Sequence, residues 1–238
     1  MRPVSPVVKN LIIINVLFFL ASNAIPALEN ILSAYYWASP NFRPWQIVTH
    51  MFMHANLMHI FFNMYGLYIF GPALEHYWGP KKFLTYYIVS GLGAFLLHNG
   101  MTYYELQKAV AVLSPEEWDI VRSEGAEAIN MGKNFIDPTL ARANSILNTG
   151  MVGASGALFG ILLGFGMLFP HVELMLLFPP IPLKARVLVL GYGALELISA
   201  MQGNPGDNVA HFAHLGGMIT GYLLLKYWQG QQPTYREW

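Results

Sequence analysis

Long apolar stretches separated by short polar connections dominate the chain. A helix that crosses the hydrocarbon core of a bilayer needs about 20 consecutive, mostly apolar residues. Six stretches approach this length, and they are Val8–Leu28, Leu57–His76, Phe83–Thr102, Met151–Phe169, Leu183–Met201 and Val209–Trp228. The pattern therefore predicts an all-α, polytopic membrane protein in which six transmembrane helices form one domain over residues 1–238.

A long polar segment, Tyr103–Thr149, separates the third and fourth apolar stretches. It carries seven acidic and four basic residues, too many for a membrane span. We therefore expect an extracytoplasmic insert whose amphipathic helices lie on the outer membrane surface. A connecting role is favoured over a platform for substrate or lipid.

Helix boundaries can be predicted within this insert. Ser114, Pro115 and Glu117 have the spacing of an N-cap, a first-turn proline and a capping-box glutamate, and Gly132 provides a stop. Asp137 stands before a proline and predicts the start of a second short helix.

The distribution of cations predicts the orientation of the spans. Six spans place both termini on one side of the membrane, and the short loops of the other side hold only Arg43. The terminus side holds eight cations, which are Arg2, Lys9, Lys81, Lys82, Lys184, Arg186, Lys226 and Arg236. Because short cytoplasmic loops are enriched in lysine and arginine, both termini are predicted to be cytoplasmic.

Composition agrees with a membrane protein and excludes several functions. Only 11% of the residues are charged and the mean hydropathy is +0.40, whereas soluble domains carry about 25% charged residues. A net charge of zero argues against nucleic-acid binding. The absence of cysteine excludes disulfides, thiolate zinc sites and a cysteine nucleophile. No small-residue cleavage site follows the first stretch, so we expect a retained helix rather than a signal peptide.

The fourth stretch contains a serine among small residues. Gly153, Ser155 and Gly156 form a Gly-x-Ser-Gly string, and Gly156, Gly160 and Gly164 recur at every fourth position. A serine in an apolar helix usually bonds to its own backbone, and the glycines alone indicate close helix packing. The string by itself is weak evidence for catalysis.

The sixth stretch carries a histidine at a comparable depth. His214 is followed by Gly217 and Gly221, a spacing that also allows a near approach of helix backbones. Both helices run from outside to inside, which places Ser155 and His214 about 6–8 Å below the outer boundary. A serine hydroxyl within reach of a neutral imidazole is the minimal unit of base-activated nucleophilic catalysis. Ionisable groups within a membrane favour a functional role.

The second stretch adds two polar side chains on one helix face, because His59 and Asn63 are four residues apart. A tetrahedral intermediate needs fixed hydrogen-bond donors for its oxyanion. His59, Asn63 and the backbone N–H of Ser155 are suitable donors. The alternative, with comparable weight for this pair alone, is a polar contact between helices.

Together these residues resemble the rhomboid proteases, over about Trp45–Leu225 without the insert. The resemblance rests on three short motifs in a shared order, which are His59-x-x-x-Asn63, Gly153-x-Ser155-Gly156 and His214-x-x-Gly217-x-x-x-Gly221. It implies a six-helix membrane bundle and an intramembrane serine endopeptidase that cleaves transmembrane protein substrates near the outer leaflet.

The resemblance also implies roles for individual residues. Ser155 would be the nucleophile and His214 the general base and later the acid, as a dyad without an acidic third member. His59 and Asn63 would support the oxyanion, together with Gly153. Gly156, Gly217 and Gly221 would serve packing at the site, as would Phe159, which stands where the family often has a tyrosine.

The first outer loop departs from the family pattern. Trp45 is followed by Gln46 where the family has an arginine, and the nearest arginine is Arg43. The anchoring of this loop is therefore left open, whereas catalysis is not expected to depend on it directly.

Other ionisable residues allow further hypotheses. His50, His54 and His59 could bind a metal, but no HExxH motif or adjacent carboxylate accompanies them, so no metal and no cofactor are predicted. His50 and His54 are more consistent with holding water near the site. His211 lies near His214 without its glycine spacing, and Glu196 in the fifth stretch faces a polar cavity or pairs with a neighbour.

The loop Gln202–Asn208 is rich in glycine and precedes the helix of His214, so it is predicted to act as a lid. A substrate helix would approach from the lipid near the second and fifth helices and unwind locally. Substrates with glycine, proline or small polar residues near the boundary would be preferred.

Two other functions remain as alternatives. One is a catalytically silent rhomboid-like protein that binds or chaperones membrane helices, although such relatives lose the serine or histidine. The other is a transporter, for which no inverted repeat is found. The lipid bilayer and transmembrane proteins are the expected partners, a bacterial plasma membrane is the expected location, and no oligomeric state is predicted.

Overall fold

The computed structural model describes residues 5–175, 181–202 and 210–231. The elements in chain order are α1 (Pro6–Ala24), α2 (Ala27–Leu32), α3 (Gln46–Thr49), η1 (His50–Phe52), α4 (Leu57–Trp78), α5 (Pro80–Val110), α6 (Pro115–Asn130), α7 (Pro138–Asn148), α8 (Ser155–Leu168), β1 (Glu173–Met175), β2 (Pro182–Lys184), α9 (Ala185–Gln202) and α10 (His211–Gly230). The protein is therefore predominantly helical, as predicted.

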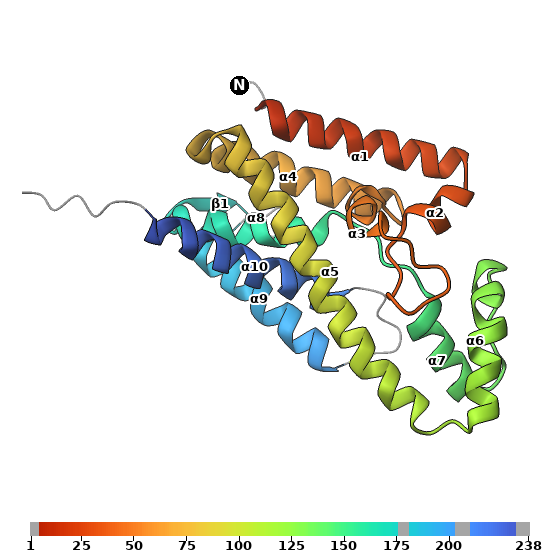
Figure 1. Cartoon of the computed structure of the whole chain (residues 1–238). Coiled ribbons are helices and arrows are strands. Elements are labelled where there is room, and N and C mark those ends of the chain that lie inside the picture. Colours follow the sequence, from red (N-terminus) through yellow and green to blue (C-terminus); the bar gives the residue numbers. More distant parts are fainter. Residues whose placement is uncertain (1–4, 176–180, 203–209, 232–238) are drawn as a thin grey trace, which may run out of the picture.

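Each of the six apolar stretches contains one long helix, namely α1, α4, α5, α8, α9 and α10. In Figure 1, α5 crosses the front of the bundle diagonally, and α8 lies behind it between α4 and α10. Helix α5 extends to Val110, beyond the predicted end at Thr102. Its additional turns carry the chain from the bundle to the insert.

Helix α8 is the centre of the bundle. It packs against α4, α5, α9 and α10, and nine of its residues are buried. Glycine at several of these positions lets the neighbouring backbones approach closely. The main apolar core surrounds it and includes Ile161 and Phe165 of α8, Leu67 of α4 and Tyr86 of α5. The hydroxyl of Tyr86 donates a hydrogen bond of 3.0 Å to the carbonyl of Gly160.

The insert contains the two predicted helices. Ser114 accepts from the N–H of Glu117, and the Glu117 side chain accepts from the N–H of Ser114, which completes the capping box of α6. Asp137 accepts from the N–H groups of Thr139 and Leu140 at the start of α7. These bonds hold the pKa of the Asp137 carboxyl below its usual value, because they stabilise its ionised form.

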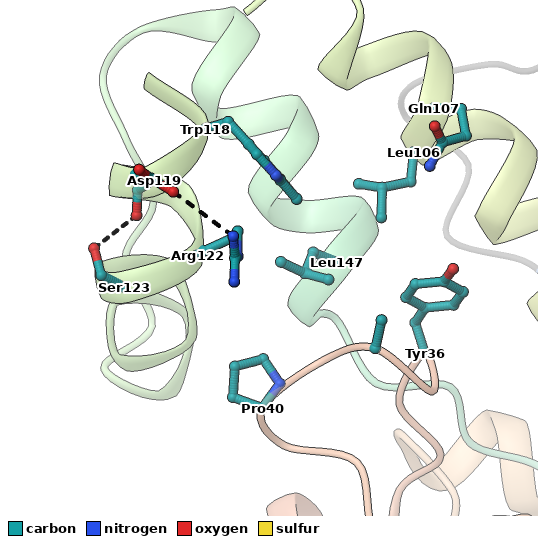
Figure 2. Close-up of a pocket in the computed structure, with 10 residues that line it drawn as sticks. Tyr36, Pro40, Leu106, Gln107, Trp118, Asp119, Arg122, Ser123 and Leu147 are labelled. Atoms are coloured by element: carbon teal, nitrogen blue, oxygen red, sulfur yellow. Dashed lines mark hydrogen bonds and ion pairs between the residues drawn. The ribbon is translucent and has the colours of Figure 1, made fainter. Parts of the chain in front are cut away.

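A cavity of about 680 Å³ lies between α6, α7, the end of α5 and the first outer loop (Figure 2). Trp118 and Leu147 face it with apolar surface, and Tyr36 lines it from the loop. Its charged residues, Asp119 and Arg122, are exposed and pair with each other at 3.7 Å. This cavity holds no pairing of a nucleophile with a base, so it is not the candidate site.

Gln46 answers the question of how the first outer loop is anchored. Its side chain is fully buried, and its amide nitrogen donates to the carbonyls of Ile31 and Asn41, at 3.2 and 3.1 Å. Its amide oxygen accepts from the N–H of Arg43 at 2.9 Å. Glutamine therefore fixes the loop at this position without a guanidinium group.

Glu75 of α4 caps the start of α1. Its carboxylate accepts from the hydroxyl of Ser5 at 2.5 Å and from the N–H groups of Val7 and Val8 at 3.0 Å each. The first N–H groups of a helix have no intrahelical acceptor, and the helix dipole favours an anion there. Glu75 thus joins the two helices through a buried polar contact.

Two short strands interrupt the helical pattern. β1 and β2 pair antiparallel, with Leu174 opposite Leu183, and β2 comes directly before α9 in the chain. This pair was not predicted.

Two helices of the described part, α1 and α4, are long and apolar enough to cross a membrane by length and composition. Helix α8 is as apolar but has 14 residues. Tyrosine, glycine and charged residues lower the hydropathy of α5, α9 and α10.

Candidate active site

Ser155 is the first residue of α8. The segment before it is not helical, because Met151 forms an isolated bridge with Ala34 and Gly153 has a φ of +132°. The predicted start at Met151, which would place Ser155 about one turn inside the helix, is therefore wrong. The consequence is chemical, since Ser155 belongs to the first turn of α8, whose N–H groups have no intrahelical acceptor.

His214 lies in the first turn of α10, which begins at His211 rather than at the predicted Val209. Its Nε2 atom is 2.8 Å from the Oγ of Ser155, within hydrogen-bond distance. His214 is 8% exposed, so the imidazole is largely removed from solvent. The structure therefore brings the two residues together at the N-termini of two helices.

Glycines bring α8 and α10 close enough for this contact. A Cβ atom at Gly217 would lie 1.8 Å from the carbonyl oxygen of Gly156, which no side chain tolerates. A Cβ at Gly221 would lie 3.2 Å from the Cα of Gly160. These positions meet backbone to backbone, as the small-residue spacing predicts.

Phe159 fixes the plane of the imidazole. Its ring is stacked on His214 with centroids 4.1 Å apart and an interplanar angle of 11°. Phe159 lies one helical turn after Ser155, so the same helix supplies the serine and the ring beneath its histidine. The phenyl ring provides this stacking without the hydroxyl of a tyrosine.

His59 lies beside the serine, whereas the position of Asn63 is less direct. The His59 imidazole would be 2.9 Å from a Cβ at Gly153, and it lines the same cavity as Ser155 and His214. Asn63 is 4% exposed, and its amide nitrogen has no hydrogen-bond partner among the described residues. The N–H of Gly153 donates to the carbonyl of His50 at 2.9 Å, which occupies that donor.

A cavity of about 800 Å³ leads to the serine–histidine contact. The starts of α4, α8 and α10 converge on it with the later part of α5 and the end of α7. A smaller pocket, of about 10 Å³, also borders Ser155 and is lined by His50, Gly153 and Ala210. Its volume matches that of a single water.

Glu196 of α9 has two histidine neighbours, which answers why an acid lies in an apolar stretch. Its Oε2 atom is 2.6 Å from the Nδ1 of His211 and 2.9 Å from the Nδ1 of His214. The side chains of all three are 10–15% exposed. No firm role follows from their sequence positions, because only the packing of α9 against α10 brings them together.

Glu196, His211 and His214 are the one group among the described residues with the composition of a metal site. Their possible ligand atoms lie within 4.8 Å of one another. The 2.6 Å distance between Glu196 and His211 is that of a hydrogen bond, whereas two ligands on a zinc ion are about 3 Å apart or more.

The predicted lid, Gln202–Asn208, lies outside the described residues except for Gln202.

The fold and this contact define a class: a helical protein that holds a serine and a histidine at the N-termini of two helices packed through glycine. The rhomboid domain family matches residues 41–114 and 128–229. The chain therefore belongs to the rhomboid family of membrane proteins, which includes serine proteases such as AarA.

Three relatives illustrate the similarity. RHOMBOID-like protein 12, a mitochondrial protein of Arabidopsis thaliana, is 30% identical over 201 residues, which cover 84% of this chain and 48% of that protein. Rhomboid protease AarA of Providencia stuartii is 28% identical over 185 residues, 76% of this chain and 54% of AarA. An uncharacterized mitochondrial rhomboid protein of Schizosaccharomyces pombe is 28% identical over 194 residues, 76% of this chain and 49% of that protein.

The chain spans about half the length of these relatives. They come from mitochondria as well as from a bacterium. The expectation of a bacterial plasma membrane is therefore not supported. The family does support the expectation of a membrane protein.

Proposed function

We propose that this protein is an intramembrane serine endopeptidase that cleaves transmembrane segments of other proteins with Ser155 and His214. The observation that carries the proposal is the 2.8 Å contact between Ser155 Oγ and His214 Nε2 at the end of a cavity. Family membership supports the same reaction, because the family includes serine proteases.

The proposed reaction begins with the removal of the Ser155 hydroxyl proton by His214 Nε2. The Oγ–carbon bond forms as the substrate carbonyl becomes an oxyanion. The protonated imidazole then donates to the leaving amine, and the carbon–nitrogen bond breaks to give an acyl-enzyme. A water activated by the same nitrogen hydrolyses this ester and restores the serine.

Two groups of donors support the oxyanion in this proposal. The first is the N-terminus of α8, where the backbone N–H groups beside Ser155 lack intrahelical acceptors. The second is the His59 ring beside Gly153, with Asn63 one turn later on α4, whose amide nitrogen has no partner among the described residues. The small pocket next to Ser155 has room for the hydrolytic water, and His50 lines it.

The proposed membrane arrangement has six spans, formed by α1, α4, α5, α8, α9 and α10, within one domain. Both termini lie on the side with more lysine and arginine, and the insert with the active site lies near the other surface. The shared end of α4, α8 and α10 supports this arrangement, because all three helix starts line one cavity. The lipid bilayer and transmembrane proteins are then the partners.

The alternatives have weaker support. A silent helix-binding relative has no need of an aligned serine and histidine, and a transporter has no need of the serine hydroxyl. Purified protein in detergent would be incubated with a fluorophosphonate probe as wild type, Ser155→Ala, His214→Ala and Ser199→Ala. Ser199 lies on α9 and does not line the cavity, so it serves as the control serine. Labelling of the wild type and Ser199→Ala, with loss in the other two, is expected.

A fluorogenic transmembrane peptide provides the second measurement, with the same variants reconstituted in vesicles. Cleavage by the wild type and Ser199→Ala alone is expected. Folded wild type that neither reacts with the probe nor cleaves the peptide would contradict the proposed function in favour of a helix-binding protein.

A further inference from the structure

We propose that Glu196 is a positioning residue for His214, so that the site works as Ser155–His214–Glu196 rather than as a pair. This inference rests on the proposed protease function and deepens it. It begins from the single oxygen, Glu196 Oε2, that lies 2.9 Å from the Nδ1 of His214. The opposite ring nitrogen of the same histidine contacts Ser155.

The carboxylate selects the tautomer of His214. An ionised carboxylate only accepts hydrogen bonds, so the proton of the neutral imidazole belongs on Nδ1, the nitrogen that faces Glu196. Nε2 then carries the lone pair and faces the hydroxyl of Ser155 at 2.8 Å. This is the tautomer that removes the serine proton. Without the carboxylate, the opposite tautomer would leave Nε2 unable to act as a base.

The carboxylate also compensates the charge that appears during the reaction. When the hydroxyl proton moves to Nε2, the imidazole becomes a cation, and its Nδ1–H still faces Glu196 Oε2. In a site that is mostly removed from water, a neighbouring anion stabilises this cation more than it would in solution. The proton later moves to the leaving amine, and Glu196 keeps its charge throughout.

His211 holds the carboxylate in place. Its Nδ1 is 2.6 Å from the same Oε2 atom, a short charge-assisted hydrogen bond. A lone carboxylate within a membrane is costly, so it needs such a partner. His211 therefore orients Glu196 in this proposal. The sequence did not indicate this role, because His211 belongs to no glycine motif.

The geometry sets the size of the expected effect. The approach of Glu196 to His214 is short but not aligned as a hydrogen bond, so Nδ1 makes an electrostatic contact rather than a directed one. Removal of an aligned aspartate lowers kcat about 10,000-fold in the serine proteases of soluble folds. We expect a smaller loss here, of about 10- to 1,000-fold.

Helix α9 also contacts the ring on which His214 is stacked. Tyr192, one turn before Glu196, contacts Phe159 edge to face with centroids 6.3 Å apart. Phe159 is stacked on His214. Helix α9 therefore influences both the proton-bearing edge of the imidazole and the ring beneath it.

The decisive variants are Glu196→Gln, which keeps the shape and removes the charge, and Glu196→Asp, which keeps the charge. Ser199→Ala on the same helix is the matched control. For each protein, kcat and KM for cleavage of the fluorogenic peptide and the rate of fluorophosphonate labelling would be measured, with thermal unfolding in parallel.

We expect Glu196→Gln to lower kcat and the labelling rate at least about 10-fold, with KM within about twofold of the wild type. Glu196→Asp should recover part of the lost kcat. Ser199→Ala should keep the kcat of the wild type. Unfolding temperatures should stay close together. Treatment with EDTA should leave the wild-type activity unchanged.

Several results would overturn the inference alone. These are wild-type kcat in Glu196→Gln, an equal loss in Glu196→Asp, a loss that follows unfolding, or inactivation by EDTA, which would indicate a metal on the two histidines. Wild type that neither labels nor cleaves would instead contradict the proposed function itself.

Discussion

Helices α8 and α9 both pack against α10, but they do so in opposite ways. Between α8 and α10, glycines place backbone against backbone, with Gly217 directly on the carbonyl of Gly156. Between α9 and α10 a side chain fills the space, because a Cβ at Gly193 of α9 would lie 3.1 Å from the Cε of Met218. The two residues of α9 that are buried, Ala185 and Val189, pack on Gly166 of α8 instead. The contact that forms the serine–histidine pair therefore has one allowed spacing, whereas the contact that brings Glu196 can adjust.

The difference suggests a division of labour. The position of the nucleophile relative to its base is set by the fold itself, because neither backbone can yield. The position of the carboxylate depends on a more exposed helix, where Leu190 and Met201 are 72% and 79% exposed. Substitutions should therefore act abruptly at the first contact and gradually at the second.

The largest effect is expected for Gly217→Val. The new Cβ would overlap the carbonyl of Gly156, so α10 must move away from α8. We expect destabilisation of at least about 4 kcal/mol, with loss of folded protein. Gly230→Ala is the matched control, since its Cβ would meet no atom within 4 Å. Thermal unfolding in detergent compares the two, and a folded, active Gly217→Val protein would remove the basis of the comparison.

A smaller effect is expected for Val189→Ala. Val189 is 4% exposed and packs on Gly166 of α8, at the buried start of α9. Loss of two methyl groups should reduce the free energy of unfolding by about 1–2 kcal/mol. Leu190→Ala, at the adjacent exposed position, should change it by less than about 0.5 kcal/mol. Equal losses in denaturant titrations of both variants would show that α9 is packed on all sides.

The smallest effect is expected for Gly191→Ala, and it has the opposite sign. Nothing lies within 4 Å of the new Cβ, and glycine in a helix interior is less favourable than alanine. We expect stabilisation of about 0.5 kcal/mol, measured by the same titration. A loss of stability would mean that a neighbour approaches this face of α9.

Much of the fold was predictable because local signals agreed with it. Apolar stretches located six long helices, and the capping box at Ser114 and Glu117 located α6. The start of α8 was misplaced, since apolar content continues from Met151 while Gly153 has a backbone conformation that excludes a helix. The apolar pattern of a segment gives no information about its backbone φ angles.

The candidate site was predictable to a different extent. Ser155, His214 and His59 belong to motifs with fixed spacing, and the structure groups them around one cavity. Phe159, one turn after Ser155, is stacked on His214. Glu196 belongs to no such motif. Its contact depends on how α9 is rotated against α10, and no spacing within one helix encodes that rotation.

The capping of α1 by Glu75 has a consequence for biosynthesis. The three donors of Ser5, Val7 and Val8 find their acceptor 67 to 70 residues later in the chain. At a synthesis rate of about 5–20 residues per second, the first helix waits on the order of ten seconds for this partner. During that interval water or lipid headgroups must occupy its N-terminus. The arrival of α4 is thus the event that converts the first helix from a separate inserted segment into part of the bundle.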